Sequence, residues 1–384
     1  MIGLDPTDMA AESSWDFLAD LLNLPYPFLA QTRFMLGYDF SSNSYAITGK
    51  YVSIIDPGND YTAFMELFRR GVNPTDIKKI VLTHGHVDHV MGMFELLRRY
   101  DNPGQNLEIF LHEAGPQEFK ELAGQIGCRL TEVKGGETLN LSGFDLEVIH
   151  TPGHTLDGIC LYHAPSRSIF TGDTVLPHAM AEMDQAAGGR LDHYLYSLRT
   201  LLKRDIDNVL PGHGALVGRI GRGIVMDTFE GLIKKVVGLE TPWLAGATKL
   251  AQQGLMEEAV FCCNKKLVTS PENFAALEMK AFLLIDLGRN AEAVESFDKI
   301  LAQKPEHFYA FLGKGSALMG LGDYKGSLAY FDRALAIDPR HQETLINKGM
   351  ALYLCGRFDE AMDIEVFQRE FTSRFKQELQ GKTP

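Results

Sequence analysis

The chain has 384 residues, more than one ordinary domain contains, so we expect two domains. Its formal net charge of −13 argues against a general nucleic-acid binder, because phosphate contacts require positive charge. The five cysteines form no Cys-x-x-Cys pair, the first residues show no signal-peptide pattern, and no run of about 18 apolar residues occurs, so we expect a cytoplasmic protein that does not span a membrane.

Residues 1–30 are acidic and contain one amphipathic stretch, Trp15 to Leu24, which predicts a helical extension. Over residues 31–238, strand and helix patterns first alternate, and strands then cluster, which is typical of two sheets with helices outside them. We expect helices over 61–70, 90–100, 116–126 and 194–203, and strands over 45–47, 52–55, 79–83 and 107–111.

The most informative stretch, residues 84–89, reads His-Gly-His-Val-Asp-His and follows an apolar strand. Side chains two residues apart on an extended backbone point the same way, so His84 and His86 would bind one ion. Asp88 and His89 lie where a helix starts and should point elsewhere, which favours a second ion beside the first. Imidazole and carboxylate groups together suit cations such as zinc, manganese or iron.

Three further ligand-type residues follow strand-like runs: His154 in Thr-Pro-Gly-His, Asp173 in Thr-Gly-Asp, and His213 in Pro-Gly-His-Gly. Loops on a rigid scaffold commonly carry chemistry in this way. Five histidines and two aspartates suit two ions, and Asp173 is the natural bridge because a carboxylate has two oxygens. Water bound to such ions would have its pKa lowered to about 7, and Asp88 or Asp173 would steer it or take its proton.

The order His-x-His-x-Asp-His, Gly-His, Gly-Asp, Gly-His resembles the metallo-β-lactamase superfamily over residues 33 to 220. The resemblance implies an αββα sandwich with its site at one edge of the paired sheets. It also implies two metal groups and a bridge: His84, His86 and His154; Asp88, His89 and His213; and Asp173. By the same resemblance, Asp56 would support residues 84–89, the metal loop. A buried carboxylate must be hydrogen-bonded, and it can orient a loop that carries ligands.

The segments Thr-Pro-Gly-His and Thr-Gly-Asp are most similar to those of hydroxyacylglutathione hydrolases. This similarity implies a dinuclear hydrolase of a small thioester or ester, with zinc as the first choice of metal and iron or manganese as alternatives. Two other hypotheses stay open: a single-iron oxygenase acting on persulfides, and an interaction scaffold with a vestigial metal domain. Residues 174–193 should overhang the site, so His178 and Arg190 are candidates for substrate contact.

The region after residue 238 has a period of 34 residues. The period is carried by prolines and glycines: Pro271, Pro305 and Pro339, and Gly254, Gly288, Gly322 and Gly356. This period is the signature of the tetratricopeptide repeat (TPR), in which two helices meet at a turn where a small residue would let them approach closely. We expect an all-α TPR solenoid over residues 239–384, with three repeats and a partial or capping fourth. It would bind a protein, a peptide or a second copy of the chain.

Overall fold

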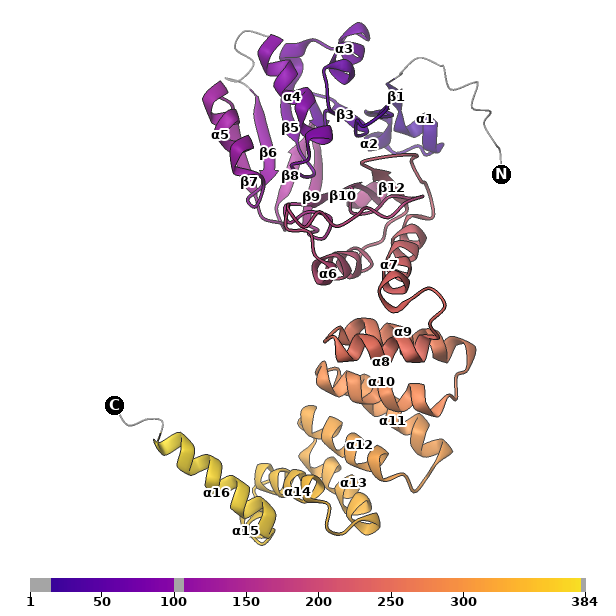
Figure 1. Ribbon diagram of the computed structural model, residues 1–384, viewed down its shortest axis with the longest axis vertical. Coiled ribbons are helices and arrows are strands. Elements are labelled where there is room, and N and C mark those ends of the chain that lie inside the picture. The colour runs from indigo at the N-terminus through magenta and orange to yellow at the C-terminus, as the bar shows by residue number, and fades with distance from the viewer. Residues whose placement is uncertain (1–14, 100–106, 381–384) are drawn as a thin grey trace. The chain divides into compact units, whose positions relative to one another are not determined.

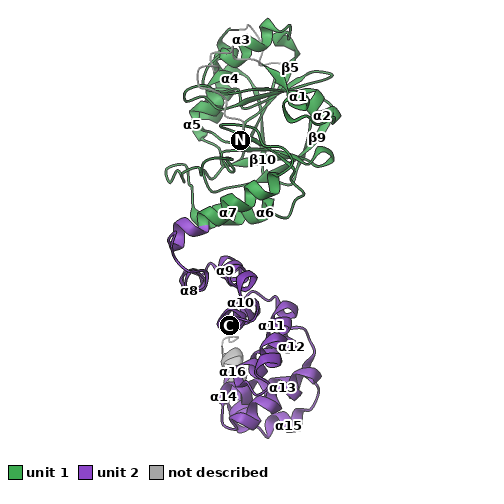
Figure 2. Cartoon of the chain, turned by 90° about the vertical axis from the view of Figure 1, so that its right-hand side faces the viewer, with its two compact units in different colours: residues 1–232 green, residues 233–384 purple. Residues whose placement is uncertain are grey.

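A computed structural model of the chain describes residues 15–99 and 107–380, and side chains as far as residue 373. The chain divides into two compact units, residues 1–232 and 233–384 (Figure 2). The first 14 residues of the expected N-terminal extension lie outside the described residues. Among the residues that are described, no helix has the length and apolar character needed to cross a lipid bilayer.

The first unit contains two sheets (Figure 1). One has seven strands in chain order: β1 (Asp16–Phe17), β2 (Thr32–Met35), β3 (Ser44–Thr48), β4 (Val52–Ile55), β5 (Ile77–Val81), β6 (Glu108–His112) and β7 (Arg129–Val133). Its strands are antiparallel from β1 to β4 and parallel from β4 to β7. The other sheet has the order β12 (Asn208–Pro211), β11 (Ser168–Gly172), β10 (Ile159–His163), β9 (Phe144–His150) and β8 (Thr138–Leu141).

Alternate residues of the parallel strands contribute to two separate cores, because successive side chains point to opposite faces of a sheet. Ile80 and Ile109 pack under the helices that cover the seven-stranded sheet: α3 (Thr62–Arg69), α4 (Val87–Arg99) and α5 (Gln117–Ile126). Their neighbours Val81 and Phe110 pack between the two sheets. Burial of both faces explains the continuous apolar runs at residues 80–82 and 109–111 in this part of the sheet.

Helices α6 (Leu191–Leu201) and α7 (Gly221–Val237) lie on the outer side of the second sheet, which completes the αββα order of layers (Figures 1 and 2). The short helices α1 (Leu18–Leu22) and α2 (Pro27–Ala30) precede β2. The expected fold class is confirmed. Helix α4 begins earlier than the expected residue 90, so Asp88 and His89 lie in its first turn.

The second unit is all helical, as expected. Its helices are α8 (Trp243–Gln252), α9 (Met256–Thr269), α10 (Phe274–Asp286), α11 (Asn290–Gln303), α12 (Phe308–Gly320), α13 (Tyr324–Ile337), α14 (Gln342–Leu354), α15 (Phe358–Met362) and α16 (Glu365–Gln380). The fourth pair departs from the pattern because α15 ends after five residues, and the buried side chain of Phe367 in α16 fills the core beside it.

The periodic glycines correct one expectation. Gly254, Gly288, Gly322 and Gly356 have φ between 71° and 82°, and a Cβ atom at any of them would meet no atom within 4 Å. The turn needs glycine for its left-handed backbone, not for close helix approach. Close approach occurs inside α12 instead, where a Cβ on Gly315 would lie 2.6 Å from the ring of Phe331.

Candidate metal centre

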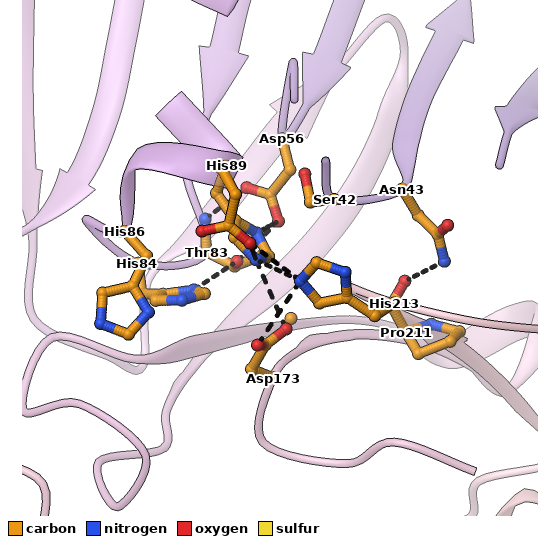
Figure 3. Close-up of polar contacts among 12 residues, drawn as sticks. Ser42, Asn43, Asp56, Thr83, His84, His86, His89, Asp173, Pro211 and His213 are labelled. Atoms are coloured by element: carbon orange, nitrogen blue, oxygen red, sulfur yellow. Dashed lines mark hydrogen bonds and ion pairs between the residues drawn. The ribbon is translucent and has the colours of Figure 1, made fainter. Parts of the chain in front are cut away.

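Strand ends carry most of the predicted ligands to one edge of the paired sheets (Figure 3). They are His84 and His86 after β5, Asp88 and His89 in the first turn of α4, His154 after β9, Asp173 after β11, and His213 after β12. The structure brings all seven together. Their potential ligand atoms form three overlapping groups in which every atom lies within 4.8 Å of the others: His84, His86 and His154; His84, His89 and Asp173; and Asp88, His89 and His213.

The first group presents inward-facing nitrogens. His86 Nδ1 and His154 Nε2 lie 3.1 Å apart. The carbonyl oxygen of Glu182 contacts His154 Nδ1 and can only accept, so that nitrogen carries the proton and Nε2 keeps its lone pair. His84 Nε2 is buried and has no hydrogen-bond partner within the described residues. A buried nitrogen without a partner is costly, and a cation would satisfy it.

The second group is joined to the first by Asp173. His213 Nε2 lies 3.0 Å from Asp88 Oδ2 and 3.3 Å from His89 Nε2. Asp173 places Oδ1 3.4 Å from His89 Nε2 and Oδ2 3.7 Å from His154 Nε2. Its carboxylate therefore reaches both groups, as the sequence led us to expect of a bridge. Asp173 Oδ1 is buried and makes no hydrogen bond among the described residues.

A glycine leaves room for this arrangement. A Cβ atom on Gly212 would lie 2.4 Å from Asp173 Oδ1 and 2.8 Å from His89 Cε1. Any side chain here would therefore displace the carboxylate or the imidazole ring. The Pro-Gly-His order that made His213 conspicuous in the sequence has this steric cause.

Asp56 holds the metal loop from behind, on the far side of His89 from Asp173 (Figure 3). Its Oδ2 accepts from Thr83 Oγ1 at 2.6 Å and lies 2.8 Å from His89 Nδ1, and its Oδ1 accepts from the Thr83 amide at 2.8 Å. Because a carboxylate accepts, His89 Nδ1 carries the proton and Nε2 faces the second group. Asp56 is buried and has a left-handed backbone with φ of 48°.

The electrostatics of the site favour metal-ligand protonation states. Burial, followed by the neighbouring His89, holds the pKa of His84 well below its usual value, so this ring stays neutral. Burial alone would raise the pKa of Asp88 and of Asp173, but contacts with His213 and His89 outweigh it and lower both. Both carboxylates are therefore ionised at neutral pH, as ligands must be.

His89 behaves differently from His84. Burial would lower its pKa, but the carboxylates of Asp56 and Asp173 outweigh burial and raise it well above the usual value. Without a cation, a proton on His89 offsets these two negative charges. Three features together fit a bound divalent metal: the buried ligand atoms without hydrogen-bond partners, the histidine nitrogens that face one another, and the ionised carboxylates.

Sequence reasoning did not identify three residues that fix the site. Thr83 links Asp56 to the metal loop. Asn43 Nδ2 donates to the carbonyls of Pro211 and Gly214, at 3.0 and 2.9 Å, and so clamps the turn that presents His213. Tyr45 donates to the same Pro211 carbonyl at 2.7 Å. Thr83 had a usable signal, its place before His84, whereas Asn43 and Tyr45 lie in no motif.

The overhanging segment reaches the site through residues other than those expected. His178 is exposed and has no polar contact with the seven ligand candidates within the described residues. Arg190 is also exposed and turns its guanidinium onto Asp192, with hydrogen bonds of 3.0 and 2.9 Å. Glu182 and Asp184 contact the histidines instead.

Two family profiles match the chain: the metallo-beta-lactamase superfamily over residues 37–213, and the tetratricopeptide repeat over residues 278–342 and 317–369. A probable metallo-hydrolase of Methanocaldococcus jannaschii is 32% identical over 203 residues, which cover 48% of this chain and 93% of the relative. The chain belongs to the metallo-beta-lactamase superfamily. Its recognition from the histidine and glycine motifs, and that of its repeats, is confirmed.

Two other proteins are similar to this chain over about half of its length. An atrochrysone carboxyl ACP thioesterase of Aspergillus fumigatus is 27% identical over 196 residues, which cover 50% of this chain and 42% of the relative. The chain thus spans less than half the length of that protein. A metallo-beta-lactamase family protein of Thermus thermophilus has a crystal structure that aligns with a TM-score of 0.45 at 20% identity, covering 58% of this chain and 94% of the other.

Proposed function

We propose that the chain is a metal-dependent hydrolase of a small acyl substrate, with thioesters as the first choice. One observation carries the proposal: Asp173 reaches both groups of ligand candidates, His154 in one and His89 in the other. This arrangement suits two divalent ions, zinc first, with iron or manganese as alternatives. The name of the thioesterase relative supports an acyl thioester.

Bound divalent ions would supply Lewis acidity, both to acidify a water and to polarise the acyl carbonyl. The protein's part is to fix the donors and to accept the proton that the attacking water releases. The Asp88 side chain is 24% exposed and that of Asp173 is 12% exposed. Asp88 is therefore the better placed to exchange protons with solvent, whereas Asp173 is held between the groups.

We propose that the substrate enters through an open recess in the segment that follows Glu182. It has a volume of about 520 Å³ and is lined by Met183, Gln185, Gly188, Gly189, Arg190, Leu191 and Asp192. These residues directly follow Glu182, whose carbonyl contacts His154. Because Arg190 is already paired with Asp192, we propose that it shapes the wall and does not bind a substrate anion.

A substrate panel combined with metal analysis tests the proposal. The purified full chain should contain about two equivalents of metal and hydrolyse thioesters faster than lactones or phosphodiesters. Persulfide should not be consumed. Oxygen-dependent turnover of persulfide by an iron-loaded protein, without thioester cleavage, would instead assign the chain to the oxygenase hypothesis.

We further propose that the repeats of residues 239–384 bind a protein or peptide partner, or a second copy of the chain. Stacked helix pairs form an extended concave surface, which is the usual binding surface of such solenoids. A fragment of residues 239–384 should be soluble and helical, and sedimentation of the full chain and the fragment should show the same self-association if the repeats drive it. Aggregation of the fragment alone would contradict an independent binding domain.

A further inference from the structure

A short segment after β11 holds two histidines of the first metal group from outside. The carbonyl of Glu182 accepts from His154, and Asp184 Oδ2 lies 3.1 Å from His86 Nε2. The Asp184 amide in turn donates to the carbonyl of His154 at 2.8 Å. Two histidines that are 68 residues apart in sequence therefore share one outer support.

The carboxylate of Asp184 has a fixed orientation. Its Oδ1 accepts from the amides of Ala186 and Ala187 at 2.9 and 3.2 Å, which leaves Oδ2 directed at His86. Its carbonyl accepts from the amide of Gly189 at 2.7 Å, which closes the segment into a compact turn. The contact with His86 is thus built by the loop and does not depend on a freely rotating side chain.

This contact decides the tautomer of His86. A carboxylate can only accept, so Nε2 of His86 carries the proton and Nδ1 presents its lone pair. Nδ1 is the nitrogen that faces His154 Nε2 at 3.1 Å. With the outer nitrogens of both rings protonated, the two inner nitrogens are acceptors facing each other, an arrangement that a cation stabilises.

We propose that Asp184 is a positioning residue for His86, and that it sets the metal affinity of the first group. The proposal rests on the metal dependence in the proposed function, but not on the choice of substrate. It gives Asp184 the role for His86 that Asp56 has for His89. Loss of a carboxylate of this kind usually weakens metal binding about 10- to 100-fold. The Asp184 side chain is 38% exposed, so we expect about 10-fold, the lower end of that range.

The test is Zn²⁺ affinity, measured on the full chain by competition with a chromophoric chelator and without any substrate. Asp184→Asn keeps an oxygen for the amides of Ala186 and Ala187 but removes the charge beside His86. Asp145→Asn is the matched control, because it makes the same change of residue type at an exposed side chain of β9 that lies outside the metal groups. We expect Asp184→Asn to weaken Zn²⁺ binding about 10-fold and Asp145→Asn to leave it unchanged.

A double-mutant cycle separates positioning from general damage to the loop. In a His86→Ala background, Asp184→Asn should cause no further loss of Zn²⁺ affinity. In the otherwise unchanged chain, Asp184→Asn should change the visible spectrum of the Co²⁺-loaded protein and Asp145→Asn should not. Equal losses in the wild-type and His86→Ala backgrounds would overturn the proposal, as would unchanged affinity in Asp184→Asn. Tight, Asp184-dependent metal binding without thioester cleavage would reject only the proposed substrate.

Discussion

The two units of this chain build their important contacts over very different distances in sequence. In the metal-binding unit, His89 and His213 are 124 residues apart in sequence, and their Nε2 atoms lie 3.3 Å apart in space. In the repeat unit, Phe331 of α13 packs on Gly315 of the neighbouring helix α12. The comparison shows that a site assembled from distant strand ends depends on the whole domain, whereas a solenoid depends on nearest neighbours.

The largest effect expected from this comparison is at Asp173, where the two metal groups meet. Asp173→Ala should lower kcat for a thioester by at least about four orders of magnitude, because the ions contribute several kcal/mol to the transition state. Steady-state rates and elemental analysis provide the check. Asp145→Ala, at an exposed position of β9, is the control. A rate within tenfold of wild type in Asp173→Ala would contradict a bridging role.

A core substitution in the repeats should act on the second unit alone. Phe331 is fully buried, so Phe331→Ala should destabilise the repeats by about 4 kcal/mol while the metal content stays unchanged. Urea unfolding followed by far-UV circular dichroism measures the loss. Phe358→Ala, at a position that is 53% exposed, should cost much less. Loss of metal from Phe331→Ala would show that the two units do not respond separately.

Metal removal should destabilise the first unit alone, whereas Phe331→Ala should destabilise the second. If free metal is held at about 100 times Kd, stripping it with a chelator should lower the free energy of unfolding of the first unit by about 2.7 kcal/mol. The second unit has no group of metal-ligand candidates among its described residues, so its transition should not move. Calorimetry of the full chain beside the 239–384 fragment tests this. A chelator-induced shift in the isolated fragment would be inconsistent with it.

The smallest effect concerns the glycines of the repeat turns. Gly322 has φ of 82° with open space around it, so Gly322→Ala should destabilise the repeats by about 1 kcal/mol through backbone strain alone. Gly124 in α5 has the same open space in ordinary helical backbone, and Gly124→Ala should stabilise the first unit by about 0.5 kcal/mol. Thermal unfolding measures both changes in stability. If both substitutions changed stability in the same direction, the left-handed turn would not be the cause.

Sequence patterns predicted the features that depend on residues close together in the sequence. The 34-residue period identified the repeat helices because each helix pair forms from local contacts. The histidine motifs pointed to the correct edge of the sheets because each ligand candidate follows its own strand. The reason for the turn glycines was wrong, since a left-handed backbone and a close contact exclude side chains equally and sequence alone does not distinguish them.

The supports around the histidines were not predictable in the same way. Asp184 contacts His86 across 98 residues and belongs to no motif. Its place depends on how the segment after β11 folds back, which also decides that His178 points into solvent. Asn43 acts across 168 residues on the carbonyl of Pro211, where a side chain recognises backbone and leaves no pattern of residue types.

The left-handed backbone at Asp56 has a consequence for how freely this position can vary. Asparagine and aspartate enter that region more readily than other residues with a side chain, whereas glutamate would bring the carboxylate at the cost of strain. Asparagine would satisfy the backbone, but its amide offers one acceptor oxygen where Thr83 and His89 engage two. The backbone conformation favours asparagine and aspartate, and the hydrogen bonds require two acceptor oxygens. Aspartate meets both requirements, so a randomised library at this codon should return aspartate almost alone.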